Sequence, residues 1–163
     1  MKKLSLLFCL LTMASYCSIM AQIPAVTLKT IDGKIISSNQ ISNNGKPLII
    51  DFFATWCKPC CRELDAISEV YDEWMEETGV KIVCVSIDQA QNSHKVKPFV
   101  NNKGWEYDVL LDPNGDLKRA LGIQMIPYVM IVDGQGKIVY KHTGYTDGEE
   151  NELINKVREI IRP

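Results

Sequence analysis

Apolar residues along the chain follow two patterns, continuous runs and a helical repeat. Residues 47–53 and 80–87 are apolar almost without a break, which is typical of strands buried on both faces of a parallel sheet. The segment between them repeats apolar residues at steps of three and four. That repeat predicts one amphipathic helix that begins near Pro59 and runs to about Thr78, with Gly79 ending it. Strand, helix and strand in this order predict an α/β fold with a right-handed parallel crossover.

Shorter elements flank this central unit, and turn-forming residues border them. The clearest border is Asp32-Gly33, because Asp-Gly between two alternating segments is a strong signal for a hairpin turn. Pro98 interrupts a helical composition, so only a short or kinked helix is expected around it. In chain order the sequence predicts a hairpin over 25–36, a loop over 37–46, a short helix over 93–103, a strand over 107–111, a short helix over 116–121, a hairpin over 128–142 and a last helix over 147–161.

The first 21 residues differ from the rest of the chain. Lys2 and Lys3 precede an apolar stretch that ends at the small residue Ala21, which is the layout of a secretory signal peptide. We therefore expect residues 1–21 to be a signal peptide and residues 22–163 to form one domain, exported to the periplasm or cell envelope. An uncleaved membrane anchor is the alternative, although serine and threonine interrupt the apolar stretch.

Charge and cysteine content exclude several classes of protein. Lysine and arginine total 18 against 20 aspartate and glutamate, a net charge of −2, and no basic run occurs. A nucleic-acid-binding surface is therefore not expected. Of the six cysteines, Cys57, Cys60, Cys61 and Cys84 follow the expected signal peptide. This number is too small for a disulfide-dense scaffold and indicates cysteine chemistry instead.

The candidate chemistry lies in Trp56-Cys57-Lys58-Pro59-Cys60, directly after the first apolar strand. Two cysteines separated by two residues at the start of a helix can close and open a disulfide. Unpaired N–H groups at a helix N-terminus favour a thiolate, and such sites lower a cysteine pKa from about 8.5 to about 3.5–7.5. We expect Cys57 to be the nucleophile. Cys60, one turn on and more buried, would attack the resulting mixed disulfide.

Two other uses of this cysteine pair fit the sequence less well. Zinc usually needs two more Cys or His ligands at matching spacing, and Cys61, Cys84, His94 and His142 do not supply it. A purely structural disulfide would gain little stability from so short a loop. Redox chemistry is the favoured interpretation, and it requires neither a metal nor another cofactor.

Three nearby residues are candidates for tuning the dithiol. Asp51 is a carboxylate inside an apolar run, where desolvation should raise its pKa and suit it to exchange a proton with Cys60 through water. An exposed strand end is the alternative for Asp51. Lys58 would add modestly to thiolate stabilisation, or would simply be a solvated surface residue. Pro59 fits the first helical turn, where its missing N–H costs nothing, and stiffens the loop between the cysteines.

The ten residues 51–60, DFFATWCKPC, resemble the active-site stretch of the thioredoxin superfamily. Glu63, the long middle section and Ile126-Pro127 are more similar to its TlpA/ResA-type branch of bacterial envelope thiol–disulfide oxidoreductases. The resemblance covers about residues 23–162. It implies a thioredoxin fold, with a central mixed β-sheet flanked by helices, an N-terminal β-hairpin and a TlpA-type middle insertion.

The resemblance also assigns roles to residues outside the cysteine pair. Asp51 matches the buried aspartate of thioredoxins, and Ile126-Pro127 matches the cis-proline loop that faces the cysteines and presents backbone to a bound peptide. A proline at the start of a strand is the alternative for Pro127. From the residues alone, Trp56 is expected to cover the edge of the site, or else to be a core aromatic. Glu63 matches an acidic position of TlpA/ResA-type relatives, or else stabilises the helix N-terminus from its first turn.

The expected function is exchange of the Cys57–Cys60 dithiol with protein disulfides, more as a reductant than as an oxidant. In an oxidising compartment a reductant must be recharged, so the resemblance implies a membrane-bound thiol electron donor; we expect a monomer. One alternative is a thiol peroxidase of peroxiredoxin type, which would use Thr55 beside a lone reactive cysteine. Another is a non-catalytic binding module, against which the intact cysteine pair argues.

Overall fold

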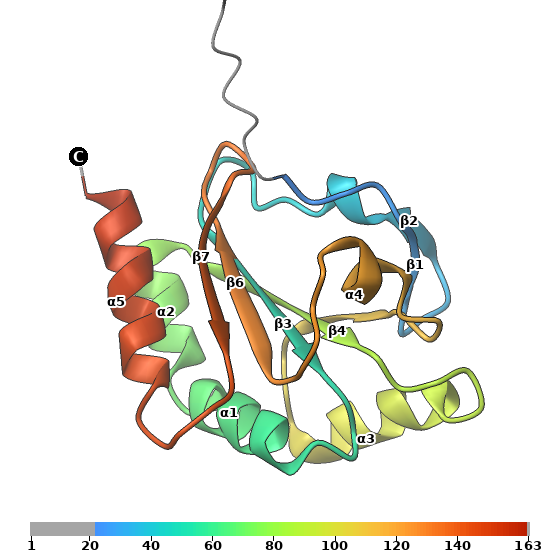
Figure 1. Cartoon of the computed structure of the whole chain (residues 1–163). Helices are drawn as coiled ribbons and strands as arrows, with labels where there is room; N and C mark the ends of the chain where they lie inside the picture. The colour runs from blue at the N-terminus through green and yellow to red at the C-terminus, as the bar shows by residue number, and fades with distance from the viewer. Residues whose placement is uncertain (1–21, 163) are drawn as a thin grey trace, which may run out of the picture.

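The computed structural model describes residues 22–162. In this part of the chain seven strands form one mixed sheet in the order β2-β1-β5-β4-β3-β6-β7 (Figure 1). The strands are β1 Thr27–Thr30, β2 Ile35–Ser37, β3 Leu48–Phe53, β4 Lys81–Ser86, β5 Asp108–Leu111, β6 Tyr128–Val132 and β7 Ile138–Thr143. The helices are α1 Lys58–Ser68, α2 Tyr71–Thr78, α3 Val96–Lys103, α4 Asp116–Ala120 and α5 Glu150–Ile161, with single 3₁₀ turns η1 Ser38–Gln40 and η2 Ser93–Lys95.

Strand β3 lies inside the sheet, parallel to β4 and antiparallel to β6. All six of its residues are buried, as the continuous apolar run predicts. Successive side chains of a strand point to opposite faces, so β3 contributes to two separate cores. Ile49 and Phe53 belong to the core cluster under α1, α2, α3 and α5. Ile50 and Phe52 belong to the cluster on the other face, which α4 and the N-terminal segment cover.

The single long helix expected after the cysteines is wrong. The chain forms two helices, because the backbone leaves the helical conformation at Val70, whose φ and ψ are −123° and 2°. The N–H of Val70 donates to the carbonyl of Ile67. The second helix is held from its first residue, since the buried Tyr71 hydroxyl accepts a hydrogen bond of 3.1 Å from the backbone N–H of Ile82 on β4. Gly79 ends α2 in the left-handed conformation, as expected.

The other predicted elements are present with shifted ends. Both hairpins form, β1–β2 and β6–β7, and the β3–β4 pair is parallel as the crossover predicts. Pro98 lies in the first turn of α3, where a missing N–H breaks no helical hydrogen bond, so the helix is short but continues past it. The loop expected over 37–46 contains the turn η1.

The expected signal peptide, residues 1–21, lies outside the described residues. Within residues 22–162, no helix is both long and apolar enough to cross a membrane.

Candidate active site

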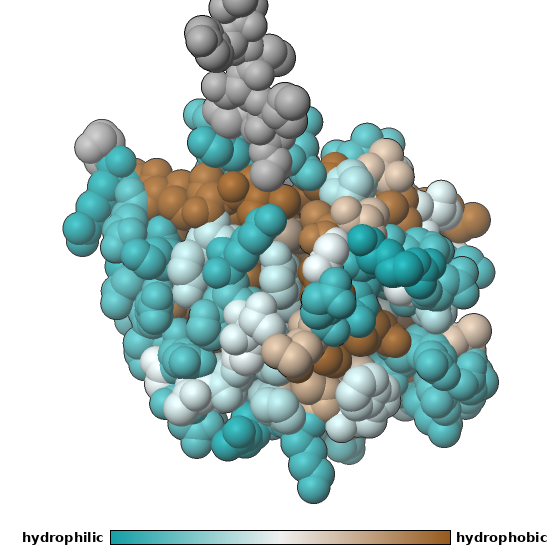
Figure 2. All heavy atoms as spheres, viewed as in Figure 1, coloured by the Kyte–Doolittle hydropathy of each residue, from teal (hydrophilic) through white to brown (hydrophobic). Residues whose placement is uncertain are grey.

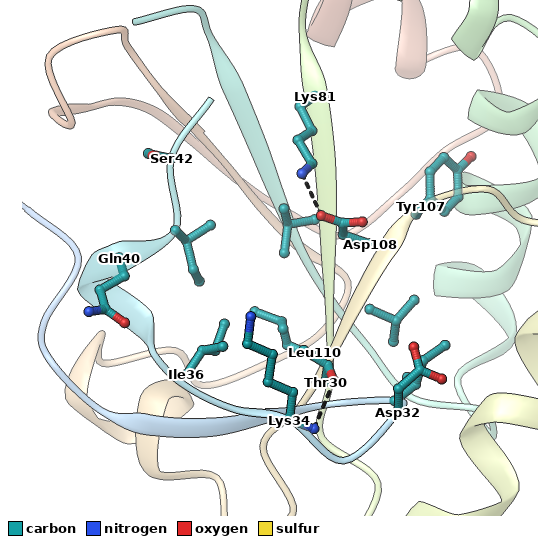
Figure 3. Close-up of a pocket in the computed structure, with 14 residues that line it drawn as sticks. Thr30, Asp32, Lys34, Ile36, Gln40, Ser42, Lys81, Tyr107, Asp108 and Leu110 are labelled. Carbon is teal, nitrogen blue, oxygen red and sulfur yellow. Dashed lines mark hydrogen bonds and ion pairs between the residues drawn. The ribbon is translucent and has the colours of Figure 1, made fainter. Parts of the chain in front are cut away.

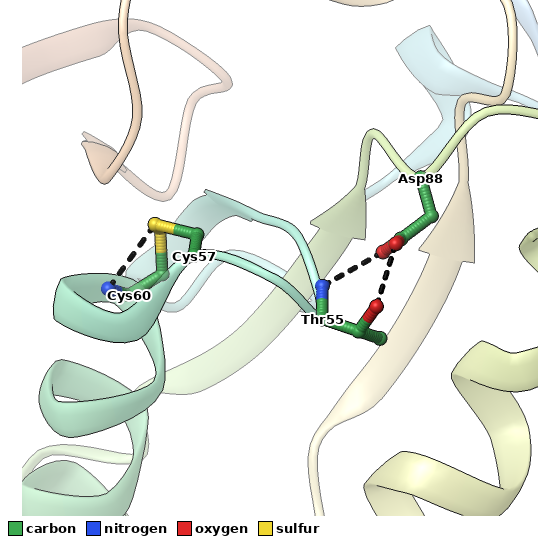
Figure 4. The surroundings of a disulfide bond; sticks show 4 residues. All are labelled: Thr55, Cys57, Cys60 and Asp88. Carbon is green, nitrogen blue, oxygen red and sulfur yellow. Dashed lines mark hydrogen bonds between the residues drawn. A yellow bond between two sulfur atoms is a disulfide. The ribbon is translucent and has the colours of Figure 1, made fainter.

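Cys57 and Cys60 form a disulfide at the start of α1, directly beyond the carboxyl end of β3 (Figure 4). Their Cα atoms are 5.3 Å apart. Cys57 caps the helix, and its sulfur accepts a hydrogen bond of 3.3 Å from the backbone N–H of Cys60. Cys57 is 5% exposed and Cys60 is fully buried. The helix N-terminus thus directs its N–H groups at the sulfur that is nearer to solvent, which favours a thiolate there.

The loop that leads into the cysteines is fixed by Asp88, a residue beyond the end of β4. The Asp88 carboxylate accepts hydrogen bonds from the backbone N–H of Thr55 at 2.9 Å and from the Thr55 hydroxyl at 2.6 Å (Figure 4). It also accepts one from the Ser86 hydroxyl at 2.9 Å. Asp88 is only 1% exposed, and three donors stabilise its charge in place of water. A buried carboxylate therefore ties the end of β3 to the end of β4, one residue ahead of Trp56.

Ile126 and Pro127 lie at the same end of the sheet as the disulfide. Tyr128 begins β6 and pairs with Phe52 of β3, which places the preceding residues beside the chain that leads to Cys57. The Ile126–Pro127 peptide bond is cis, as the resemblance implies. Pro127 is buried and Ile126 half-buried. The expected cis bond is present.

An apolar rim surrounds this end of the molecule. Trp56 is 65% exposed and Met125 is 66% exposed, large values for side chains that water disfavours. In Figure 2 a tan and brown area lies over the lower end of β6 and the segment that joins it to α4, surrounded by hydrophilic atoms. A groove of about 520 Å³ adjoins Trp56 and is also lined by Ile87, Pro113 and Arg119. The site therefore offers apolar contact beside the disulfide.

Asp51 is fully buried, so the alternative of an exposed strand end is wrong. It pairs in register with Cys84 on β4 and Val129 on β6. Its side chain lies on the face of β3 that also carries Ile49 and Phe53, which pack in one cluster with Cys60. Neither carboxyl oxygen has a hydrogen-bond partner. Burial raises the pKa of Asp51 to about 8, because water no longer stabilises the charged form.

Glu63 is the second buried carboxyl beneath the disulfide. It is 4% exposed and sits in the second turn of α1, so the alternative of a first-turn residue at the helix N-terminus is wrong. Burial, and then the charge of Asp51, raise the pKa of Glu63 to about 10. One oxygen, Oε2, has no hydrogen-bond partner. When two buried carboxyls repel each other, the pair loses its two protons in separate steps. Each step is then a property of the pair and not of one residue.

The remaining cysteines do not join the disulfide. Cys61 is half-buried and Cys84 is fully buried, and both are free thiols. Burial raises the pKa of each thiol, which lowers the fraction of reactive thiolate at neutral pH. In residues 22–162 no group of three or more His, Cys, Asp or Glu side chains could hold a metal ion.

A second cavity, of about 510 Å³, lies beside β1, β4 and β5 (Figure 3). Lys81 and Asp108 form an ion pair of 2.5 Å on its wall, and Tyr107 also lines it. None of the candidate site residues predicted from the sequence lies on this wall. Cavity size alone would not locate the site, and the cysteine chemistry does.

Comparison with known proteins places the chain in a family. The model of the AhpC/TSA family matches residues 19–141. The chain belongs to the AhpC/TSA family. Sporulation thiol-disulfide oxidoreductase A of Bacillus subtilis (strain 168) is 32% identical over 130 residues, which cover 78% of this chain and 76% of that protein.

Further proteins are similar to this chain in sequence and in fold. Thiol-disulfide oxidoreductase ResA of Halalkalibacterium halodurans is 28% identical over 136 residues, 83% of this chain and 73% of that protein. The solution structure of a thioredoxin-like protein from Porphyromonas gingivalis is 62% identical, covers 87% of this chain and 93% of its own, and has a TM-score of 0.78. The thioredoxin fold and the resemblance inferred from the sequence are confirmed.

This AhpC/TSA-family site contains most of the residues that the sequence singles out. At the surface end of β3 the structure brings together Trp56, Cys57, Lys58, Pro59, Cys60, Ile126 and Pro127. Lys58 is exposed and Pro59 is the second residue of α1. Asp51 lies deeper, beneath α1, and Glu63 is a buried residue of α1 itself.

Two residues of the site have no counterpart among the predictions. Asp88 follows the second buried strand as Thr55 follows the first, and the carboxyl ends of parallel strands lie at one edge of a sheet. Asp88 could have been predicted from this placement. Met125 directly precedes Ile126, and nothing in its sequence context indicates that its side chain is exposed.

Proposed function

We propose that the protein exchanges electrons with other proteins through the Cys57–Cys60 pair, as a thiol–disulfide oxidoreductase. The observation that carries the proposal is the disulfide at the N-terminus of α1, beside an apolar rim. The names of the relatives at 32% and 28% identity support it, since both are thiol-disulfide oxidoreductases.

Reduction of a target protein proceeds in two exchanges. The Cys57 thiolate attacks one sulfur of the target disulfide, and the other target sulfur leaves as a thiolate and takes a proton. Cys60 then loses its proton and attacks Cys57 in the mixed disulfide, which releases the second target thiol. Two electrons pass to the target, and the Cys57–Cys60 disulfide forms. Asp51, on the same face of β3 as the core that contains Cys60, accepts the Cys60 proton as a general base.

Substrate contact is assigned to the surface around the disulfide. Trp56 and Met125 supply exposed apolar area, and Ile126 presents its backbone next to them. An extended peptide that carries the target cysteine would lie across this rim, with main-chain hydrogen bonds fixing its direction. Lys58 and Glu63 tune the cysteine pair from the surface and from beneath. Pro59 limits the motion of the loop between the two sulfurs.

The cellular setting follows from the resemblance and the N-terminus. Residues 1–21 are proposed to direct the chain to the periplasm or cell envelope, as a signal peptide or as an anchor. There the protein acts as a monomeric reductant that a membrane-bound thiol donor recharges. Its disulfide potential should then lie nearer the −270 mV of thioredoxin than the about −120 mV of a strong oxidant. Equilibration with glutathione, read by mass mapping of the pair, measures it; a value near −120 mV would reverse the direction.

The peroxidase alternative gains no support from the site. Its argument depends on Thr55 assisting a lone cysteine, whereas the Thr55 hydroxyl donates to Asp88 and Cys57 is joined to Cys60. The deciding experiment offers the reduced protein either a disulfide-containing protein or hydrogen peroxide. The proposal predicts faster oxidation by the disulfide at equal concentration. Preference for peroxide would overturn it.

A further inference from the structure

A small cavity lies at the inner end of Glu63, between α1, β6, β7 and α5. Its lining residues are Glu63, Val129, Tyr140, His142, Glu149, Glu152 and Leu153. It offers about 10 Å³ to the centre of a water molecule, close to the room that one buried water needs. Glu63, whose Oε2 lacks a partner, forms one wall. The polar groups required to bind a water are therefore present.

Strand register links the cavity to Asp51. Asp51 on β3 pairs with Val129 on β6, and Val129 pairs with His142 on β7. Paired residues project from the same face of a sheet, so these three side chains form a row beneath α1 and α5. The row begins at the unpartnered carboxyl of Asp51 and ends at an imidazole.

His142 connects this row to solvent. Its side chain is 35% exposed, and its Nε2 lies 3.4 Å from Oε2 of Glu149, which is 37% exposed. The imidazole stacks on the Tyr140 ring with centroids 6.4 Å apart. The Tyr140 hydroxyl in turn donates to Glu152 at 3.3 Å. His142 thus lines the cavity and is also partly exposed to solvent.

We propose that His142 and this cavity form a proton port, through which the buried carboxyls Asp51 and Glu63 exchange protons with solvent. The role rests on the proposed function, because each turnover requires a proton to leave Cys60. It makes His142 a relay that acts through Glu63 and Asp51, with no contact to the reacting sulfurs required.

The proton path balances with the exchange reaction. Cys60 gives its proton to the Asp51 carboxylate before it attacks Cys57. The protonated Glu63 gives its own proton, through a water in the cavity, to His142 and takes the Asp51 proton in its place. The imidazolium then releases a proton to solvent. Both target sulfurs leave as thiolates and take up one proton each. These two protons match the one released from Cys60 and the one that Cys57 gave up on forming its thiolate, so the overall exchange gains or loses no proton. The two electrons move from the dithiol to the target disulfide and do not use the port.

Several other titratable groups face the two carboxyls. They are Cys84 on β4, Tyr107 before β5, Tyr140 on β7, Glu149 before α5, and Glu150 and Glu152 on α5. Burial raises the pKa of the Cys84 thiol and of both tyrosines. An imidazole has two ring nitrogens, so it can accept a proton at one and release a proton from the other. Among the groups that face the pair, His142 is the one with this property.

The first test needs no substrate. Infrared spectroscopy follows deuterium exchange of the protonated Glu63 carboxyl after transfer to D₂O, with Glu63→Gln assigning the band. We expect His142→Gln to slow this exchange about tenfold or more, since a positioned proton-transfer group contributes on the order of 10²–10⁴ and other routes retain part of the rate. His94→Gln, at an exposed histidine in η2, should leave it unchanged. Equal exchange rates in all three proteins would overturn the proposal.

A second variant tests the cavity without changing a charge. Val129→Ile adds one methyl group to the cavity wall and should also slow exchange, whereas Val139→Ile at an exposed site of β7 should not. An unaltered rate in Val129→Ile contradicts a path through the cavity. Because these measurements use the protein alone, they stand even if no protein disulfide is exchanged.

Turnover provides the functional readout. His142→Gln should slow the step in which Cys60 resolves the mixed disulfide, and free imidazole should restore part of the lost rate. A slower rate at every pH that imidazole does not restore would show a merely structural role for His142 and overturn the proposal.

Discussion

At the scale of single residues, the site depends on carboxyls that are buried in different ways. The Asp88 carboxylate accepts three hydrogen bonds, which stabilise a negative charge in place of water. Asp51 has none, and its pKa is raised. A buried charge without partners destabilises the folded state. Asp88 is therefore expected to stabilise the fold and Asp51 to weaken it, and the role we propose for Asp51 is proton transfer.

We predict that Asp51→Asn makes the protein more stable, increasingly so at higher pH. The folded pKa of about 8 lies above the ordinary value of 3.8, so between these values the folded state holds a proton that the unfolded state has released. Stability of the parent protein therefore falls as pH rises from about 4 to 8. Asn has no such proton, and the gain should reach about 1–4 kcal/mol at pH 8 and above.

Urea unfolding over a pH series measures this difference. Asp72→Asn, at an exposed position of α2, is the matched control and should change stability little. The same Asp51→Asn protein should exchange disulfides more slowly at the step in which Cys60 attacks. A destabilised variant with full activity would show that Asp51 is a structural residue and not a proton acceptor.

We predict the opposite sign for Asp88→Asn. An amide oxygen can accept fewer of the three hydrogen bonds, so the buried Thr55 N–H or a hydroxyl loses its partner, at a cost of about 1–3 kcal/mol. Disulfide exchange should also slow, because the loop before Trp56 is less fixed. Thr55→Val removes one donor and leaves the backbone contact, so it should cost about 1 kcal/mol. If thermal unfolding of Asp88→Asn matches the parent, the anchoring role is wrong.

The sequence indicates some of these buried carboxyls more clearly than others. Asp51 stands out because a charged residue interrupts an apolar run, whereas Asp88 follows a strand, where an acid is usual. The burial of Glu63 could have been inferred, since it lies three residues after Cys60 and four before Ile67, on the same helix face. Because Glu63 carries a carboxyl, a role at the helix N-terminus was considered for it instead.

At the scale of elements, the break at Val70 is the main feature that periodicity did not predict. Three- and four-residue steps continue through 64, 67, 71 and 74, so the pattern of buried positions is the same for one helix or for two. What separates the two helices is tertiary, since the Tyr71 hydroxyl binds the backbone of β4. Such a contact cannot be read from hydrophobic spacing.

We predict that Tyr71→Phe lowers the free energy of unfolding by about 1–3 kcal/mol, because the buried Ile82 N–H loses its acceptor. Tyr145→Phe is a control of the same chemistry at a more exposed hydroxyl, which donates to Glu150 at 2.8 Å. It should cost less. Chemical denaturation compares the two, and a larger loss in Tyr145→Phe would show that the Tyr71 contact does not hold α2 on the sheet.

At the scale of the whole molecule, the sheet assembles the site from distant segments. β3 and the start of α1 supply the cysteines, β4 supplies the anchor Asp88, and the chain before β6 supplies Ile126 and Pro127. Buried strands and the cysteine motif made the fold predictable. The cavity next to His142 was not, because two strands and two helices must pack before it exists.

In the proposed reaction Cys57 attacks a protein disulfide and Cys60 resolves the product. The most direct test of these two roles is mass-spectrometric quantification of mixed disulfides that single-cysteine variants form with a disulfide-containing protein. Cys60→Ser should accumulate adducts at Cys57, because the resolving thiol is gone, and Cys57→Ser should form few, because Cys60 is fully buried. Equal adduct yields from the two variants, or adducts centred on Cys61, would contradict the claim.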